Sequence, residues 1–260
     1  MANVEITLDG HVATVMLNKP ETMNAVDPEM RVELHAIWDR IHTDPAIRVA
    51  IVTGAGEKSF CTGSDLKKTM PPPETPAQQI YGNVSGAGSL IANLRTDKPM
   101  IAAINGYAMG GGLELALACD IRVCSSNAQF ALSEVRVGSM PGAGGTVRLP
   151  RYIGRSDAML MLLTGDRVDA GEALRIGLVS RVWPQAELLP KTQEIAARIA
   201  ANAPLAVRAV KRMATQGQDM PIDTAISAER TAFGLLYQSE DRIEGRRAFA
   251  EKRTPQFKGR

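Results

Sequence analysis

The sequence predicts an α/β fold in which short apolar strands alternate with helices, followed by a helical C-terminal region. A strand–turn–helix rhythm runs through most of the chain, and near residue 200 the pattern becomes purely helical. A hairpin signal opens the chain, because alternating runs at residues 4–8 and 12–17 flank an Asp-Gly turn. We therefore expect a core with the functional site over residues 1–200 and a helical appendage over residues 201–260.

The other elements follow from start signals and periodicity. Asp27 is expected to cap the first helix, with Pro28 at its first position, since both residue types are favoured there. Residues 59–67 and 133–146 are expected to form glycine-containing turns or loops, and residues 90–94 the end of a helix. Further strands are expected at residues 49–53, 100–104, 121–124, 129–132 and 179–182, and further helices at residues 157–163, 170–176, 188–202, 204–216, 222–237 and 241–252.

Composition limits the classes of function. The 260 residues are 45% hydrophobic and 22% charged, which is typical of a globular protein with an ordinary core. A net charge of +2 gives no support to a nucleic-acid or membrane-surface role. No apolar run approaches the roughly 20 residues of a membrane helix, and the N-terminus has no signal-peptide pattern. The three cysteines lie in apolar settings without metal-ligand spacing, so we expect free thiols, no metal site and a cytoplasmic location.

The glycine-rich stretch at residues 105–120 is the most informative part of the chain. Three consecutive glycines at residues 110–112 run into strong helix formers. Backbone N–H groups in the first turn of a helix lack intrahelical acceptors and suit a developing negative charge. Glu114 is the only charged residue between Lys98 and Asp120, and an ionised carboxylate in so apolar a run needs a partner, a proton or a function.

A second small-residue turn, around Ser64, follows another predicted strand. Two backbone N–H donors, one from this turn and one from Gly111, would form an oxyanion hole if they converged. Glu114 and Glu134, both in mostly uncharged runs, are candidates for general acid and base. All three histidines lie in the N-terminal hairpin and first helix, which argues against a serine–histidine triad. Spacing alone does not show that the two glutamates meet.

Several motifs together resemble one family over essentially the whole chain. They are Asn24-Ala25 after Leu17-Asn-Lys-Pro20, Phe60-Cys-Thr-Gly-Ser-Asp-Leu-Lys67, Asn105-Gly-Tyr-Ala-Met-Gly-Gly-Gly-Leu-Glu114, Glu134 with Pro141-Gly-Ala-Gly-Gly-Thr146, and the closing Phe257-Lys258. On these motifs the chain resembles the enoyl-CoA hydratase/isomerase (crotonase) superfamily, in particular its hydratase branch.

The resemblance implies a spiral of ββα units with a C-terminal helical region that trimerises, giving a homotrimer or a homohexamer built as a dimer of trimers. It implies an acyl-CoA thioester as substrate, a place in fatty acid metabolism such as β-oxidation, and no cofactor, because CoA is part of the substrate. From the near-neutral charge and the lack of long apolar runs, we expect no nucleic-acid or membrane partner.

By position in these motifs, the resemblance implies that the N–H groups of Ser64 and Gly111 bind the thioester oxygen. Glu114 then activates water and Glu134 handles the α-proton, although this division of labour stays open. The implied contacts to substrate and CoA are Lys19, Ala25, Ser64, Asp65, Leu66, Lys67 and Gly111.

Two features depart from the hydratase pattern and bear on the acyl group. Ser133 precedes Glu134 where proline is common, and the loop at residues 68–89 contains three consecutive prolines. Hydration of a trans-2-enoyl-CoA is the favoured function. The alternatives are a related reaction on the same scaffold (isomerisation, dehydration of a hydroxyacyl- or carnitinyl-CoA, or decarboxylation) and a non-catalytic binding or RNA-associated role, in which Glu114 would only satisfy the start of its own helix.

Overall fold

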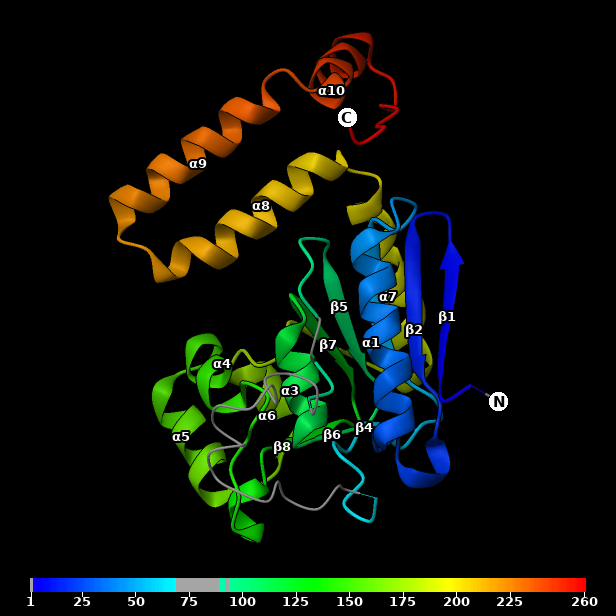
Figure 1. The fold of residues 1–260 in the computed structure, drawn as a ribbon, viewed down its shortest axis with the longest axis vertical. Helices are drawn as coiled ribbons and strands as arrows, with labels where there is room; N and C mark the ends of the chain where they lie inside the picture. Colours follow the sequence, from blue (N-terminus) through cyan, green and yellow to red (C-terminus); the bar gives the residue numbers. More distant parts are fainter. Residues whose placement is uncertain (1, 69–88, 92–93) are drawn as a thin grey trace.

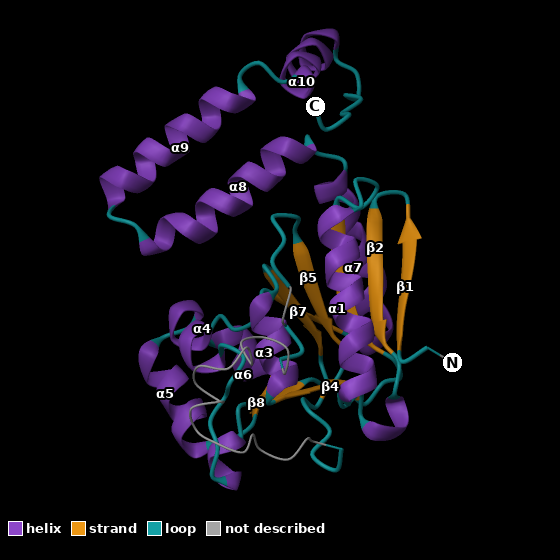
Figure 2. Cartoon of the chain, in the orientation of Figure 1, coloured by secondary structure: helices purple, strands orange, loops and turns teal. Residues whose placement is uncertain are grey.

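The computed structural model describes residues 2–68, 89–91 and 94–260, and its strands form two sheets (Figures 1 and 2). The six-stranded sheet has the order β1-β2-β3-β5-β7-β10, and the four-stranded sheet the order β4-β6-β8-β9. The strands of the larger sheet are β1 (Val4–Asp9), β2 (Val12–Leu17), β3 (Val49–Gly54), β5 (Met100–Ile104), β7 (Ile121–Ser125) and β10 (Arg181–Trp183). Those of the smaller sheet are β4 (Ser59–Cys61), β6 (Tyr107–Met109), β8 (Gln129–Ala131) and β9 (Val168–Asp169).

The hairpin predicted at the start of the chain is confirmed. β1 and β2 pair antiparallel in the register Val4 opposite Leu17, while β2, β3, β5, β7 and β10 pair in parallel. Parallel strands need crossover connections, and the connection from β2 to β3 contains the helix α1 (Pro28–Thr43). The helices between the strands pack on one face of the large sheet, and a helix after β10 packs on the other.

Alternation along β3 divides the core into two layers. Val49 and Ile51 pack with Leu188 of α7 (Gln185–Ala200), which covers one face of the large sheet. Ala50 and Val52 point the other way, into the larger cluster that includes α1 (Pro28–Thr43) and α3 (Gly111–Ala118). All six residues of β3 are buried, as expected for a central parallel strand.

The predicted start of α1 is also confirmed. The Asp27 side chain accepts a hydrogen bond from the Met30 N–H at 3.0 Å, and Pro28 is the first helical residue. Trp38 of the same helix is buried, and its indole N–H donates to the Leu90 carbonyl at 3.0 Å. α1 thereby holds the described residues just before β5 against the core.

α3 begins in very close contact with β4. A Cβ atom added to Gly112 would lie 1.9 Å from the Cys61 carbonyl oxygen, so only glycine allows this approach. β4 and β6 pair in parallel, with Ser59 opposite Tyr107, and this pairing brings the residues after β4 beside the start of α3. The contact sets the position of the candidate site.

The remaining helices differ in how they contact this core. α4 (Gly145–Tyr152), α5 (Arg155–Thr164) and α6 (Ala170–Arg175) contribute buried residues such as Leu149, Ala158 and Ala173 to it. α8 (Pro204–Gln216) and α9 (Ile222–Leu236) have no buried residue and project as a pair away from the sheets (Figure 1). α8 is tied to the core by ion pairs from Arg208 to Asp97 at 2.9 Å and from Lys211 to Asp120 at 2.8 Å. The last helix is α10 (Glu240–Glu251), and short 3-10 turns form at η1 (Pro20–Thr22), η2 (Glu134–Val137) and η3 (Gly217–Asp219).

The sequence-based prediction is wrong for several short elements. Residues 59–67 include the strand β4, residues 133–146 include η2 and the start of α4, and β10 begins at Arg181. A strand of three residues is too short to show a period and is stabilised by the strands beside it. Of the helix end expected at residues 90–94, Leu90 and Ile91 form a turn, and residues 92–93 lie outside the described residues. Of the loop at residues 68–89, only Lys68 and Ser89 are among the described residues.

Replacing Gly112 by alanine should destabilise the protein strongly, because the new methyl group would overlap the Cys61 backbone. We expect a loss of at least about 2 kcal/mol, or a fall in Tm of about 5 °C or more. Gly171→Ala is the matched control, because Gly171 lies in a helix, Ala170–Arg175, and an added Cβ would meet only Asp169 Oδ1, at an ordinary contact distance of 3.4 Å. The control should change Tm little, and equal effects of the two substitutions would contradict this account.

Candidate active site

The N-terminus of α3 forms one wall of the candidate site. Gly110, with a φ of +52°, precedes the helix, and Gly111 is its first residue. The Gly111 N–H belongs to the first turn, where N–H groups have no intrahelical acceptor and the helix end is partly positive. The buried side chain of Leu90 lies against it, since a Cβ on Gly111 would be 2.7 Å from Leu90 Cδ2. The N–H is thus a donor in a partly apolar environment.

The turn after β4 brings a second donor to the same place. The Val26 N–H donates to the Gly63 carbonyl at 2.8 Å and the Asp65 N–H donates to the Val26 carbonyl at 3.0 Å. In this parallel bridge the Ser64 N–H points away from Val26. A Cβ on Gly111 would lie 3.9 Å from the Ser64 nitrogen, so the structure brings together the two residues expected to form an oxyanion hole.

Glu114 is buried, and its carboxylate is held by the loop before α4. Its Oε1 accepts hydrogen bonds from the Ala143 N–H at 2.6 Å and the Gly145 N–H at 2.8 Å. The side chain is only 3% exposed, so these two donors replace much of the lost hydration. Nothing in the sequence indicated that Ala143 and Gly145 hold this carboxylate.

Glu134, the first residue of η2, has a different environment. Its Oε2 is buried and has no hydrogen-bond partner among the described residues, while its Oε1 would be 3.1 Å from a Cβ on Gly110. Burial raises the pKa of Glu134 above its ordinary value, and the charge of Glu114 adds to the rise. Glu134 therefore lies beside the start of α3, close enough for the charge of Glu114 to act on it, and the two carboxylates differ in how well a negative charge is solvated.

Lys19 forms an ion pair instead of standing free at the surface. Its ammonium and that of Lys68 both contact Oδ2 of Asp27, which is 1% exposed. Burial alone would raise the pKa of Asp27, but hydrogen bonds from Lys19, the Met30 N–H and Lys68 outweigh it and hold the pKa well below its usual range. One carboxylate oxygen of Asp27 thus binds the ammonium groups of two lysines.

The other expected CoA contacts lie in or beside the same turn. Ala25 is half-buried and its N–H donates to the Thr22 carbonyl at 3.2 Å. Asp65 accepts the Lys67 N–H at 3.0 Å, and Leu66 is 76% exposed. These residues are near Ser64 along the chain and present a surface beside the two N–H donors. Their role as CoA contacts stays a prediction.

Two buried asparagines hold the site together, and sequence reasoning gave them no structural role. The Asn105 amide bonds the N–H and carbonyl of Gly54 and the carbonyl of Gly56. The Asn24 side chain accepts the Lys19 N–H at 3.0 Å and donates to the Ser59 carbonyl at 2.8 Å. Both asparagines belong to the motifs that carry the family resemblance, and their small polar side chains in apolar surroundings were the available signal.

In the described part of the chain, no group of three or more histidine, cysteine, aspartate or glutamate residues is arranged to hold a metal ion. Over the same residues, no helix combines the length and apolar character needed to cross a bilayer. The cytoplasmic location expected from the sequence stays a prediction.

Comparison with known proteins decides the family. A model of the family "Enoyl-CoA hydratase/isomerase" matches residues 7–260. The chain belongs to the enoyl-CoA hydratase/isomerase family. It is 50% identical to (E)-benzylidenesuccinyl-CoA hydratase of Thauera aromatica over 256 residues, which cover 98% of this chain and 99% of the relative. It is 41% identical to carnitinyl-CoA dehydratase of Escherichia coli K12 over 262 residues, which cover 99% of both.

A crystal structure of enoyl-CoA hydratase from Bacillus anthracis superposes on this enoyl-CoA hydratase/isomerase family member with a TM-score of 0.91 at 40% identity. The match covers 99% of this chain and 100% of that chain. The α/β fold of the crotonase type, expected from the sequence, is confirmed. The position of its C-terminal helices agrees with that fold, whereas their role in trimerisation stays a prediction.

The Asp27 ion pairs give a pH-dependent prediction. Because the pKa of Asp27 is depressed in the folded protein, its stabilisation is present above its ordinary pKa of 3.8 and is lost as pH falls towards the folded value. We expect Asp27→Asn, which keeps the helix cap, to lower Tm by about 3 °C at pH 7, and the difference to shrink below pH 3.8. Asp39→Asn, an exposed change in α1, should alter Tm little. A difference that grows on acidification would refute this.

Proposed function

We propose that this protein is an enoyl-CoA hydratase, a hydro-lyase that reversibly adds water to the double bond of a trans-2-enoyl-CoA and forms a 3-hydroxyacyl-CoA. The observation that supports this most directly is that Glu134 lies against Gly110, at the start of the helix that carries Glu114, while the Ser64 nitrogen lies close to Gly111 at the same helix end. Two carboxylates next to two fixed donors match the needs of conjugate addition better than those of any nucleophilic mechanism.

The two N–H groups would act on the thioester oxygen. When water attacks the β-carbon, the electron pair of the double bond moves towards the carbonyl and negative charge develops on this oxygen. Fixed donors stabilise such a charge without reorganising, and removing one of them from other enzymes costs about 2.7–4 kcal/mol. The partial positive charge at the N-terminus of α3 acts in the same direction.

The carboxylates would supply base and acid. Glu114, whose Oε1 is held by the Ala143 and Gly145 N–H groups, takes a proton from water as its oxygen bonds to the β-carbon. Glu134 then protonates the α-carbon of the enolate, and the α-proton goes back to it in the reverse reaction. Its raised pKa favours the protonated state that the forward step needs. The cycle closes when the proton on Glu114 returns to Glu134 through solvent.

The substrate carries its own coenzyme, so we propose no cofactor or metal. Lys19 and Lys68, gathered on Asp27, and the turn with Ser64, Asp65, Leu66 and Lys67 are the proposed contacts to CoA, beside Ala25. CoA is polyanionic, and paired lysines near the site would attract it before docking.

Dehydration of a hydroxyacyl-CoA is the second candidate, since the 41% identity to a carnitinyl-CoA dehydratase favours it. It would use the same residues in reverse. The 50% identity to a hydratase of benzylidenesuccinyl-CoA adds aryl-substituted dicarboxylic thioesters to the substrates worth testing, beside unbranched enoyl thioesters.

Hydration can be measured directly as loss of the enoyl absorbance when the purified protein meets crotonyl-CoA and cinnamoyl-CoA. Glu134→Gln should lower the rate by about 10²–10⁴-fold, because the amide cannot give a proton to the α-carbon. The Tm of this variant should stay the same or rise, since the new amide side chain carries no buried charge. Glu187→Gln, an exposed change in α7, is the control. A fully active Glu134→Gln variant would exclude the proposed role.

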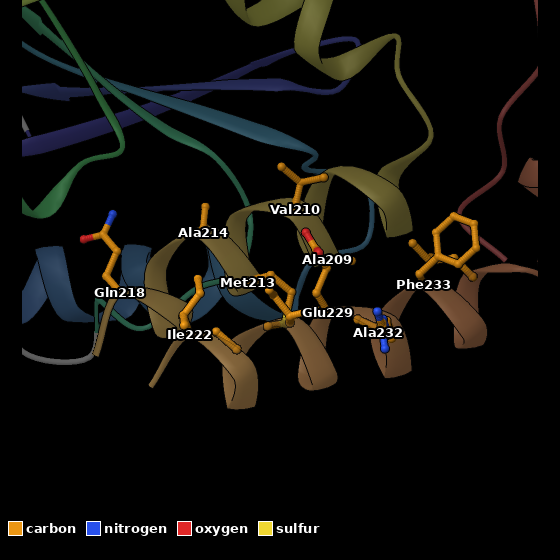
Figure 3. A pocket seen from close by; sticks show the side chains of 14 residues that line it. Ala209, Val210, Met213, Ala214, Gln218, Ile222, Glu229, Ala232 and Phe233 are labelled. Carbon is orange, nitrogen blue, oxygen red and sulfur yellow. The ribbon is translucent and has the colours of Figure 1, made fainter. Parts of the chain in front are cut away.

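We also propose that the α8–α9 arm joins copies of the chain into a homotrimer or homohexamer. The groove between the two helices, with a volume of about 760 Å³, is lined by apolar side chains such as Met213, Ile222 and Phe233 (Figure 3). Phe233 is 60% exposed and Leu235 78%, and neither helix has a buried residue. Apolar surface of this extent is typical of an interaction site.

Light scattering after size exclusion tests this assembly. We expect three or six times the chain mass of 27.9 kDa, and a smaller species for Phe233→Asp, because a charge in the apolar groove opposes burial. Asp219→Asn, a change at the exposed end of the arm, should leave the mass unchanged. A wild-type mass of one chain would refute the proposal.

A further inference from the structure

The loop that holds Glu114 is itself held from its other side. The Ala143 N–H donates to Glu114 Oε1 at 2.6 Å, while the Ala143 carbonyl accepts a hydrogen bond from Arg148 Nη1 at 2.8 Å. Both backbone polar groups of Ala143 are therefore occupied, one by the carboxylate and one by the guanidinium. Arg148 lies on α4, the helix that follows this loop, and its side chain extends back to Ala143.

The guanidinium fits closely over the loop because Gly144 has no side chain. A Cβ at Gly144 would lie 2.0 Å from Arg148 Nη1, and Gly144 has a φ of +99°, which favours glycine. The Arg148 N–H also donates to the Gly144 carbonyl at 2.8 Å. Within the described residues, no carboxylate lies within ion-pair distance of Arg148, so the carbonyl is the partner that the structure records for this charge.

The contacts of this loop differ along its length. Gly142 is exposed and has no atom within 4 Å of an added Cβ. At Gly145 an added Cβ would lie 2.9 Å from Pro141 Cβ and 3.0 Å from Leu132 Cδ1. Between these two glycines, the hydrogen bonds that the described residues make to the Ala143 peptide are those with Glu114 and Arg148.

We propose that Arg148 is a positioning residue for water activation: it fixes the Ala143 peptide so that its N–H, with that of Gly145, holds Glu114 in place. The guanidinium does not touch substrate. This inference rests on the proposed hydratase function and on Glu114 as the group that takes the proton from water. Small displacements of a catalytic group lower the rate steeply, so loss of Arg148 acts on the chemical step.

The proposal predicts a split between two reactions of one site. Hydration of crotonyl-CoA needs both glutamates. Exchange of the α-proton of butyryl-CoA in D₂O needs only Glu134 and the two N–H donors: the Glu134 carboxylate removes the proton, the enolate forms, and a deuteron returns to the carbon. Displacement of the Glu114 carboxylate therefore slows hydration but not α-proton exchange, whereas partial unfolding of the site slows both reactions.

Arg148→Met should lower kcat for hydration by about 30-fold or more, with KM and the α-proton exchange rate within about threefold of wild type. Arg148→Lys should recover most of kcat, since an ammonium can donate to the Ala143 carbonyl. Arg151→Met is the matched control, because Arg151 lies three residues later on α4, is exposed, and donates to the Val147 carbonyl outside the loop. It should retain wild-type rates in both reactions.

Gly144→Ala perturbs the same contact from the loop, since its methyl group would displace the guanidinium. Its loss of kcat should not add to that of Arg148→Met in the double variant. Unchanged hydration by Arg148→Met, or equal losses of hydration and exchange, would overturn the positioning role. If the wild type itself failed to hydrate any enoyl-CoA, the proposed function would fall instead, so the two failures are distinct.

Discussion

The contact between Gly112 and the Cys61 carbonyl is the constraint on which the candidate site depends. With no side chain at Gly112, the start of α3 can lie directly on β4, and the N–H groups of Gly111 and Ser64 then face one region. Two residues further along, Glu114 is placed by the same helix turn. Ser64 and Gly111, the proposed donors of the oxyanion hole, are 47 residues apart in the sequence but share one support, which would keep the two N–H groups preorganised.

Around that support, the two carboxylates are treated differently. Glu114 receives two short backbone hydrogen bonds, so a negative charge on its Oε1 is stabilised inside the protein. Glu134 has a buried oxygen without a partner among the described residues, and burial raises its pKa. A raised pKa favours the protonated form of Glu134, which is the form that a proton donor needs. This difference in environment agrees with the proposed roles, in which Glu134 is the acid and Glu114 the base during hydration.

The sequence predicted those parts of the structure that depend on local signals. The hairpin, the Asp27 cap of α1 and the helix after the three glycines each follow from neighbouring residues. β4 and β6 did not, because three-residue strands exist through their pairing with each other and with β8. The pairing of Lys19 and Lys68 with Asp27, and the hold of Ala143 and Gly145 on Glu114, join residues up to 41 positions apart. The family resemblance predicted the site residues. The hydrogen bonds and ion pairs that hold their side chains became visible only in the folded structure.

The reversibility of the proposed reaction limits what the site residues can determine. The ratio of kcat/KM for hydration to that for dehydration must equal the equilibrium constant, which no side chain changes. Hydration and dehydration on this chain would therefore use the same two glutamates and the same two N–H donors, and its similarity to both a hydratase and a dehydratase involves no conflict. What separates such enzymes is the acyl group that fits beside these residues. In this chain, two residues are the candidates for determining which acyl group fits. Leu90 lies against Gly111. Ser133 stands directly before Glu134, where proline is common, and lies against Gly165. Substitutions there should change the order of preferred thioesters, whereas substitutions at the glutamates should lower the rate with all of them.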